Sequence, residues 1–248
     1  MKRRSASPWF VSWHERPDAE TRLFCFPFAG GGASAYRLWA PDISENFELH
    51  SVQLPGRENR LGEAPFTRMN ELVPRLVDEL LQHLDRPYVL FGHSMGAAIA
   101  FEVARHLQEV HGSTPEHLFV SGRSAPHRPS QKTPIYDLPH DAFLTRLKDL
   151  DGTPREVLDH PELMELLIPM LRADFELDDT YCMLPGPQLS CPMSVYGGYE
   201  DPEVDVACLA AWNDLCFVPE TVTYMQGGHF YINHQRALLL EKIEAALS

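Results

Sequence analysis

The sequence predicts an α/β protein in which helices cover both faces of a mostly parallel sheet. Short apolar runs alternate with helical patterns along most of the chain, which is typical of a parallel sheet. One of these runs passes through a serine between two glycines directly into a helix. The length of 248 residues is ample for one core, so we expect a single domain covering residues 1–248.

Six apolar runs are expected to form the strands, at residues 23–28, 49–54, 88–91, 118–121, 193–196 and 221–225. Helices are expected between most of them, including residues 95–110 and a closing helix at 234–247. Another helical pattern has i, i+3, i+4 and i+7 spacing and begins at about Asn70. That start would place Pro74 in the first turn, where proline is tolerated.

The alternation breaks between about residues 126 and 187, where no convincing strand appears. Helical patterns cover residues 141–150 and 161–175, and Pro169 is expected to kink the second. The second helix carries two apolar stripes: Leu163, Leu166, Leu167, Met170 and Leu171 on one side, and Met164, Ile168 and Phe175 on the other. A surface helix needs only one stripe. We expect the first stripe to be packed and the second to face a cavity or partner; an ordinary buried helix is the alternative.

Composition excludes several classes of function. The hydrophobic fraction of 44% and the charged fraction of 23% are those of a soluble globular protein. No stretch approaches the roughly 18 apolar residues that span a bilayer, and residues 5–16 contain no continuous apolar segment typical of a signal peptide. The net charge of −14 argues against nucleic acids and anionic membranes as partners.

The cysteines also predict the compartment. Five are scattered along the chain without a C-x-x-C pair: Cys25, Cys182, Cys191, Cys208 and Cys216. An odd, dispersed set indicates reduced thiols in a cytoplasm, with neither a disulfide framework nor a metal site.

The stretch "YVLFGHSMGAAIAFEVA" supplies a candidate nucleophile. An apolar run ends in Gly92-His93-Ser94-Met95-Gly96, and an alanine-rich helix follows at once. Glycines flank the serine because side chains would clash in so sharp a bend. This G-x-S-x-G pattern between strand and helix is a nucleophile elbow, which projects Ser94 from the sheet at a helix N-terminus.

A serine hydroxyl needs a base, usually a histidine that a carboxylate orients. Of the 12 histidines we select His229, which lies on a glycine loop after the last predicted strand. That loop ends at the same edge of the sheet as Ser94. His93 is too close to Ser94 to turn back on it, and His234 is expected to open the closing helix.

The acid should follow the preceding strand, since the order in such folds is serine, acid, histidine. There the sequence reads Gly197-Gly198-Tyr199-Glu200-Asp201-Pro202, and we select Asp201. Glu200 and Asp205 are the nearby competitors.

The oxyanion formed during attack needs two backbone donors. The N–H of Met95 at the start of the helix is one. The other should come from the loop after the first central strand, "FPFAGGG". We prefer the N–H of Ala29, with Phe28 as the alternative. The loop lacks both G-x-G-x-x-G and Gly-Lys-Ser/Thr, which argues against nucleotide binding.

Seven segments together resemble the type II thioesterases, the stand-alone editing hydrolases of polyketide and nonribosomal peptide synthesis. They are "FPFAGGGASAY", "QLPGRENRL", "FGHSMGAAIAFEVA", "LPHDAFLTRL", "MLRADFELDDTY", "GGYEDPEV" and "GGHFY". The likeness covers about residues 22–247 and leaves the basic N-terminal extension without a role. It implies an α/β-hydrolase fold with a helical lid at about residues 126–187.

The resemblance also implies the chemistry. The family cleaves acyl thioesters from the phosphopantetheine arm of carrier proteins, without a metal or diffusible cofactor. Its catalytic residues carry over to Ser94, Asp201 and His229, with an oxyanion hole at Met95 and Ala29. An acyl chain needs an apolar wall. We expect Phe28 and the stripe of Met164, Ile168 and Phe175 to form part of that wall.

Three other functions remain open. A carboxylesterase or lipase would use the same triad on oxygen esters, and an acyltransferase would pass the acyl group to an alcohol or amine. A non-catalytic carrier-binding module is disfavoured because the triad is intact. Arg57 and Arg60 of "QLPGRENRL" are expected to hold a loop; contact with an acidic carrier or a phosphate is the alternative. No long unexplained apolar surface is evident, so we expect a monomer.

Overall fold

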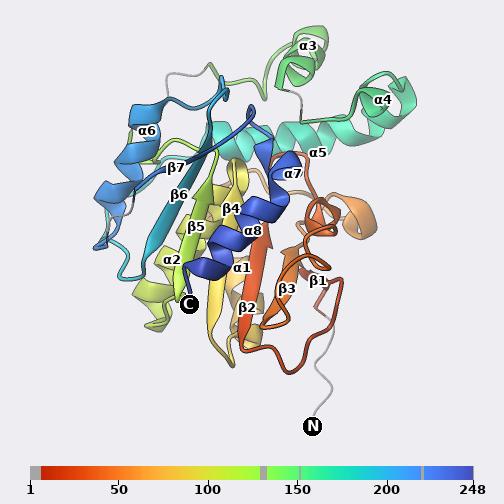
Figure 1. Cartoon of the computed structure of the whole chain (residues 1–248). Coiled ribbons are helices and arrows are strands. Elements are labelled where there is room, and N and C mark those ends of the chain that lie inside the picture. The colour runs from red at the N-terminus through yellow and green to blue at the C-terminus, as the bar shows by residue number, and fades with distance from the viewer. Residues whose placement is uncertain (1–6, 129–132, 151, 219–220, 248) are drawn as a thin grey trace.

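The computed structural model describes residues 7–128, 133–150, 152–218 and 221–247. Its seven-stranded sheet has the order β1-β3-β2-β4-β5-β6-β7 and is parallel except where β1 meets β3 (Figure 1). The strands are β1 (Phe10–Ser12), β2 (Thr21–Phe26), β3 (Phe47–Val52), β4 (Tyr88–His93), β5 (His117–Ser121), β6 (Met193–Gly198) and β7 (Thr223–Met225). The predicted, mostly parallel sheet is therefore confirmed.

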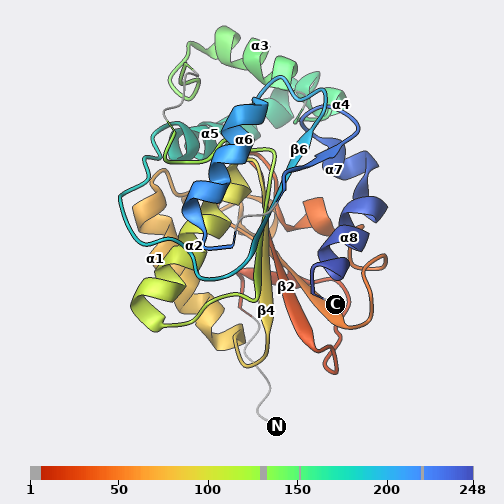
Figure 2. The same ribbon diagram turned by 60° about the vertical axis from the view of Figure 1, so that its left-hand side comes forward.

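Helices lie on both faces of this sheet, as Figure 2 shows with α1, α2 and α6 on one side and α8 on the other. The helices are α1 (Met69–Leu80), α2 (Met95–His111), α3 (His140–Leu150), α4 (Arg155–Leu158), α5 (Pro161–Asp179), α6 (Val206–Ala210), α7 (Tyr231–His234) and α8 (Arg236–Ala245). The closing helix differs from the prediction, because a break at Gln235 separates α7 from α8 and His234 ends α7.

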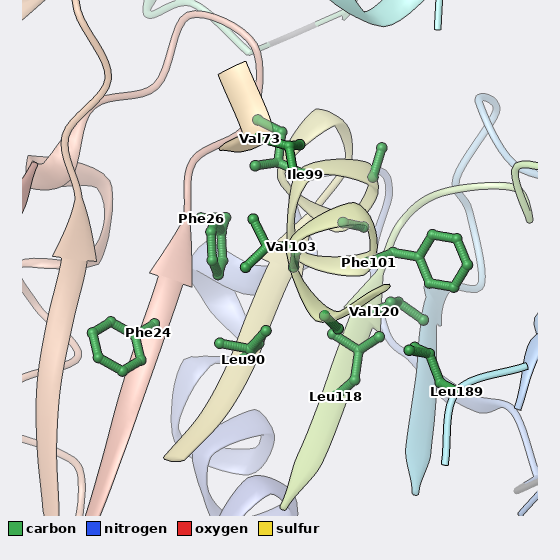
Figure 3. Close-up of a cluster of buried hydrophobic side chains, with 14 of the residues drawn as sticks. Phe24, Phe26, Val73, Leu90, Ile99, Phe101, Val103, Leu118, Val120 and Leu189 are labelled. Atoms are coloured by element: carbon green, nitrogen blue, oxygen red, sulfur yellow. The ribbon is translucent and has the colours of Figure 1, made fainter. Parts of the chain in front are cut away.

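The core has two halves because side chains alternate across a strand. Phe24 and Phe26 of β2 point to one face and join a cluster with Ile99 and Val103 of α2 (Figure 3). Leu23 points to the other face and joins the cluster that α8 covers. Both faces are buried, which explains why the central strands are continuous apolar runs in the sequence.

The N-terminal extension, to which the sequence assigned no role, forms the edge of the sheet. β1 pairs antiparallel with β3, and the N–H of Gln53 donates to the carbonyl of Trp9 over 2.8 Å. The guanidinium group of Arg16 donates to four backbone carbonyls, those of Ala40, Ile43, Ser44 and Phe47. These bonds join the extension to the loop before β3 and to the first residue of that strand.

Smaller expectations also need correction, since β2 and β3 each begin and end two residues earlier than expected. α1 begins at Met69, so Pro74 lies in its second turn and not in its first. The last strand begins at Thr223, two residues later than expected. These differences fall at element ends, where local sequence patterns are least informative.

Between β5 and β6, helices α3, α4 and α5 lie above the carboxyl edge of the parallel strands (Figures 1 and 2). We call α3–α5 the lid. Its buried apolar residues form a third cluster, separate from both halves of the core: Ile135, Phe143, Leu147, Met164, Met170 and Leu171. The kink expected at Pro169 and the single-domain organisation stay predictions.

The expected division of α5 into a packed stripe and a spare stripe holds only for Met170 and Leu171 of the first stripe, which are buried. Leu163 and Leu166 of the first stripe are 43% and 52% exposed, whereas Met164 of the second is only 3% exposed. Met164 packs within the lid, in one apolar cluster with Phe143 and Leu147 of α3. Further along α5, Leu177 belongs to the core cluster of α1 and α2, so this helix joins the lid to the body of the protein.

Amide hydrogen exchange should follow this division. We expect the amides of α3 to exchange faster than those of β4 and of the last turns of α5 around Leu177. The reason is that the buried side chains of α3 pack only in the small lid cluster and in neither half of the core. Exchange followed by mass spectrometry on proteolytic fragments tests this. Equal protection of α3 and β4 would show that the lid does not open locally.

Candidate active site

The proposed nucleophile lies in a strained turn. Ser94, between the end of β4 and the start of α2, has φ 54° and ψ −121°, a conformation that non-glycine residues rarely adopt. A Cβ atom on Gly92 would lie 2.1 Å from the carbonyl oxygen of Gly96. A Cβ on Gly96 would lie 2.2 Å from the carbonyl oxygen of Phe26 at the end of β2. Both glycines are therefore required by close packing, as the sequence predicted for the elbow.

The proposed base and acid are hydrogen-bonded to each other. Nδ1 of His229, after β7, lies 2.8 Å from Oδ2 of Asp201, after β6. The side chain of Asp201 is 1% exposed and that of His229 is 11% exposed. A Cβ on Gly198 would lie 2.6 Å from the carbonyls of Gly227 and Gly228, so the loops of the two residues are in close contact.

The competing residues have other positions. Glu200 is exposed, and the carboxylate of Asp205 caps α6 by accepting the N–H of Ala207 over 2.6 Å. His234 is exposed at the end of α7. Of the three carboxylates considered, Asp201 is the one that holds His229.

A buried polar network of His93, Ser121 and Tyr231 lies beside His229. The ring of His93, the residue before Ser94, lies 4.9 Å from the His229 ring, centre to centre. Nδ1 of His93 lies 2.8 Å from Oγ of Ser121, which is also hydrogen-bonded to the hydroxyl of Tyr231. Burial lowers the pKa of His93 well below its ordinary value, and the neighbouring His229 lowers it further. His93 is thus uncharged at neutral pH and does not oppose a positive charge on His229.

The two proposed oxyanion donors flank the elbow. Met95 is the first residue of α2, so its N–H lacks a partner within the helix. Ala29 lies in the glycine loop after β2, and its N–H donates to no acceptor among the described residues. Because Gly96 abuts the end of β2, the loop and the start of α2 are held next to each other.

The guanidinium groups of the "QLPGRENRL" segment are structural. Arg57 is 3% exposed and forms a bidentate ion pair with Asp174 of α5, with both N–O distances 2.7 Å. Arg60 is 6% exposed, pairs with Glu63 and lies over the ring of Trp9 at 4.3 Å. These contacts confirm that both arginines hold loops in place.

Comparison with known proteins places these features in a family. The model of the thioesterase domain family matches residues 21–247. The biosynthesis protein GrsT of Aneurinibacillus migulanus is 39% identical over 94% of this chain and 91% of its own length. A Brevibacillus parabrevis protein named linear gramicidin dehydrogenase LgrE is 39% identical over 98% of this chain and 94% of its own.

Among solved structures, the type II thioesterase BorB of the borrelidin biosynthetic cluster superposes with a TM-score of 0.89. It is 35% identical, and the match covers 97% of this chain and 98% of BorB. The chain belongs to the thioesterase family. Its sheet, flanking helices and elbow are those of the α/β-hydrolase fold.

The apolar side chains proposed to hold the acyl group divide into two sets. In this thioesterase the half-buried Phe28 lies at the site, with its ring 4.9 Å from Phe230 and 6.1 Å from His93. Met164, Ile168 and Phe175 belong to the lid cluster instead. The lid reaches the site nearby, because a Cβ on Gly152 would lie 2.8 Å from the Phe230 ring.

Sequence reasoning missed three residues at the thioesterase site. Phe230 packs beside His229, Tyr231 completes the network beneath it, and Asp174 binds the glycine loop by accepting the N–H of Gly30 over 2.7 Å. Asp174 carried a usable signal in the sequence, because it is a charged residue at helical spacing from the apolar Met170, Leu171 and Leu177. The structure leaves it only 2% exposed.

Two further findings concern the described residues. No group of three or more His, Cys, Asp or Glu side chains among them is placed to hold a metal ion. None of the helices in this part of the chain combines the length and apolar character needed to cross a membrane.

The stability of the thioesterase should depend on pH through His93. Unfolded, His93 takes up a proton near its ordinary pKa of about 6.5, whereas the folded protein resists protonation until well below it. The burial of neutral His93 therefore does not reduce the free energy of unfolding well above pH 6.5. Below that pH it reduces this free energy by up to about 1.4 kcal/mol per pH unit. Urea unfolding between about pH 7.5 and 5.5 should show a shallower fall for His93→Gln than for the unsubstituted protein. Parallel pH profiles would contradict this role.

Proposed function

We propose that this thioesterase releases acyl groups from the phosphopantetheine arm of carrier proteins in polyketide or nonribosomal peptide synthesis, by way of an acyl-serine intermediate. The observation that carries the proposal is the Asp201–His229 pair beside the Ser94 elbow. Support comes from the likeness to YbtT, a type II thioesterase of the yersiniabactin NRPS/PKS pathway, and to BorB, a type II thioesterase of the borrelidin cluster. The task would be to clear stalled or wrongly primed chains.

The proposed cycle has two steps. His229 takes the proton of Ser94 as Oγ attacks the thioester carbonyl. The resulting oxyanion accepts hydrogen bonds from the N–H groups of Ala29 and Met95. The carbon–sulfur bond breaks, and the thiol leaves with the proton from His229. Water then attacks the acyl-serine with His229 as base and releases the free acid. Asp201 stabilises the imidazolium in both steps because its buried carboxylate is bonded to Nδ1.

The chain's own residues suffice for this cycle, so we propose that it uses no metal or diffusible cofactor. We further propose a cytoplasmic monomer that meets its carrier domain transiently, without a nucleic acid or membrane partner. With a net charge of −14, an acidic carrier would have to dock through a local basic or apolar patch.

Release assays on one carrier protein loaded with a panel of acyl groups test the function. We expect free acid and free carrier thiol by mass spectrometry, and slower turnover of the matching oxygen esters. Preference for oxygen esters would indicate a carboxylesterase, and transfer of the acyl group to an added amine or alcohol would indicate an acyltransferase.

Triad variants are the controls for that assay. Ser94→Ala should lose at least about a thousandfold in kcat with the fold intact, and His229→Ala nearly as much, since the triad acts as a unit. A fluorophosphonate should label Ser94 and leave the alanine variant unlabelled. Asp201→Asn should be the mildest of the three. High residual activity of the Asp201→Asn variant would indicate that Glu200 or Asp205 is the acid of the triad.

The chain-length profile tests the proposed wall. Phe28→Trp narrows the space beside Phe230, so the ratio of long-chain to acetyl turnover should fall. Met164→Trp, in the lid cluster, should produce the same trend if α5 also contributes to the wall. An equal loss for every chain length, together with a lower Tm, would show instead that the substituted residue only packs the interior.

A further inference from the structure

The glycine loop after β2 contains a defined turn. The N–H of Gly31 donates to the carbonyl of Phe28 over 2.8 Å, and Gly30 has a φ of +80°. An i to i+3 hydrogen bond with a positive φ at the third residue is typical of a type II turn. In this turn the Phe28 carbonyl points inward. Because the peptide is trans, the N–H of Ala29 points to the opposite side, away from the turn.

The middle peptide of that turn is bonded to the lid. Its N–H belongs to Gly30 and donates to Oδ2 of Asp174 on α5 over 2.7 Å. Type I and type II turns differ by a flip of this peptide, so an anionic acceptor on this side favours the type II form. A flip would leave the Asp174 carboxylate without the Gly30 donor.

Arg57 binds both the acceptor and the turn. Its Nη1 donates to Oδ2 of Asp174 over 2.7 Å and to the carbonyl of Gly31 over 2.9 Å, and its Nη2 donates to Oδ1 of Asp174 over 2.7 Å. The turn is therefore held from two sides, at the N–H of Gly30 and at the carbonyl of Gly31. At 3% and 2% exposure, neither charge is screened by solvent.

Packing adds a third constraint. A Cβ on Gly30 would lie 2.7 Å from Cδ2 of Leu171, one turn before Asp174 on the same helix. The backbone of the loop thus touches α5 directly. Any displacement of α5 at this point would move the loop that carries Ala29.

We propose that Asp174, held by Arg57, is a positioning residue that sets the orientation of the oxyanion loop from the lid. The proposal rests on the proposed function, in which Ala29 donates to the oxyanion. Asp174 itself touches neither substrate nor oxyanion. It links α5, which packs in both the lid and the core, to the loop that carries the Ala29 N–H. In this proposal α5 stays in place at Asp174 while other parts of the lid move.

The competing explanation is that the ion pair only anchors the lid. α5 offers a matched control, because Glu176 also forms an ion pair with the body of the protein, to Arg68 over 2.6 Å, and makes no contact with the glycine loop among its described bonds. Glu176→Gln weakens a lid anchor and leaves the Gly30 bond intact. Asp174→Asn keeps the side-chain shape but removes the charge that Arg57 and Gly30 share.

The experiment compares Asp174→Asn, Glu176→Gln and the unsubstituted enzyme on an acyl-N-acetylcysteamine thioester, with active sites counted by fluorophosphonate labelling. For Asp174→Asn we expect a loss of kcat of roughly tenfold to a hundredfold, because small misplacements of catalytic groups are costly, with KM changed less than about threefold. The affinity for an acyl trifluoromethyl ketone, which forms an oxyanion on Ser94, should fall by the same factor. Glu176→Gln should change neither quantity.

Two results would overturn the proposal: unchanged kcat per labelled site in Asp174→Asn despite a lower Tm, or equal losses in Asp174→Asn and Glu176→Gln. If Asp174→Asn does not fold, Arg57→Lys provides the same test, since it keeps the charge but loses the bidentate geometry. An unsubstituted enzyme that neither hydrolyses the thioester nor reacts with fluorophosphonate would refute the triad, and the proposal with it. An active enzyme with indifferent variants would refute the positioning role alone.

Discussion

The structure depends on the close approach of three backbone segments at one point of the sheet. The start of α2 meets the end of β2 with no room for a side chain at Gly96, and the start of α2 also crosses Gly92. At this contact Ser94 has a positive φ of 54°, a strained conformation that costs about 1–3 kcal/mol in general. Burial of α2 between β4, β5 and α1 offsets the strain. The same contact places the helix N-terminus beside the glycine loop. The positions of the nucleophile and of both proposed oxyanion donors therefore depend on this one contact.

Around that point the buried charged side chains form pairs, and the other buried polar side chains are neutral. Asp201 balances the charge that His229 acquires in the proposed cycle, and Arg57 balances Asp174. The ring of His93 lies beside that of His229, and burial lowers the pKa of His93, so it stays uncharged and does not repel a charged His229. An additional buried cation there would oppose the imidazolium directly. The Asp201 carboxylate thus both orients His229 and stabilises its charge.

The lid combines two mechanical properties in one segment. Its outer part, α3 with the first half of α5, packs around a small apolar cluster of its own. The second half of α5 is embedded in the body through Leu177 and the Asp174 ion pair. A tethered acyl chain needs an opening, whereas the oxyanion loop needs a fixed wall. Division of α5 between the two clusters is compatible with both requirements, because the helix can be firm at Asp174 while α3 opens.

The sequence by itself determined the alternation of strands and helices, the elbow and the pair of loops that carry Asp201 and His229. These features are readable because their causes are local: side-chain periodicity within one element, steric limits around glycine, and the common edge at which parallel strands end. Only the tertiary structure decided that β1 closes the edge of the sheet, that Met164 is covered while Leu163 is exposed, and that Asp174 binds Gly30. Each of these depends on which distant segment covers a given face, and residues more than a hundred positions apart, such as Arg57 and Asp174, leave no periodic trace in the sequence when they form a buried pair.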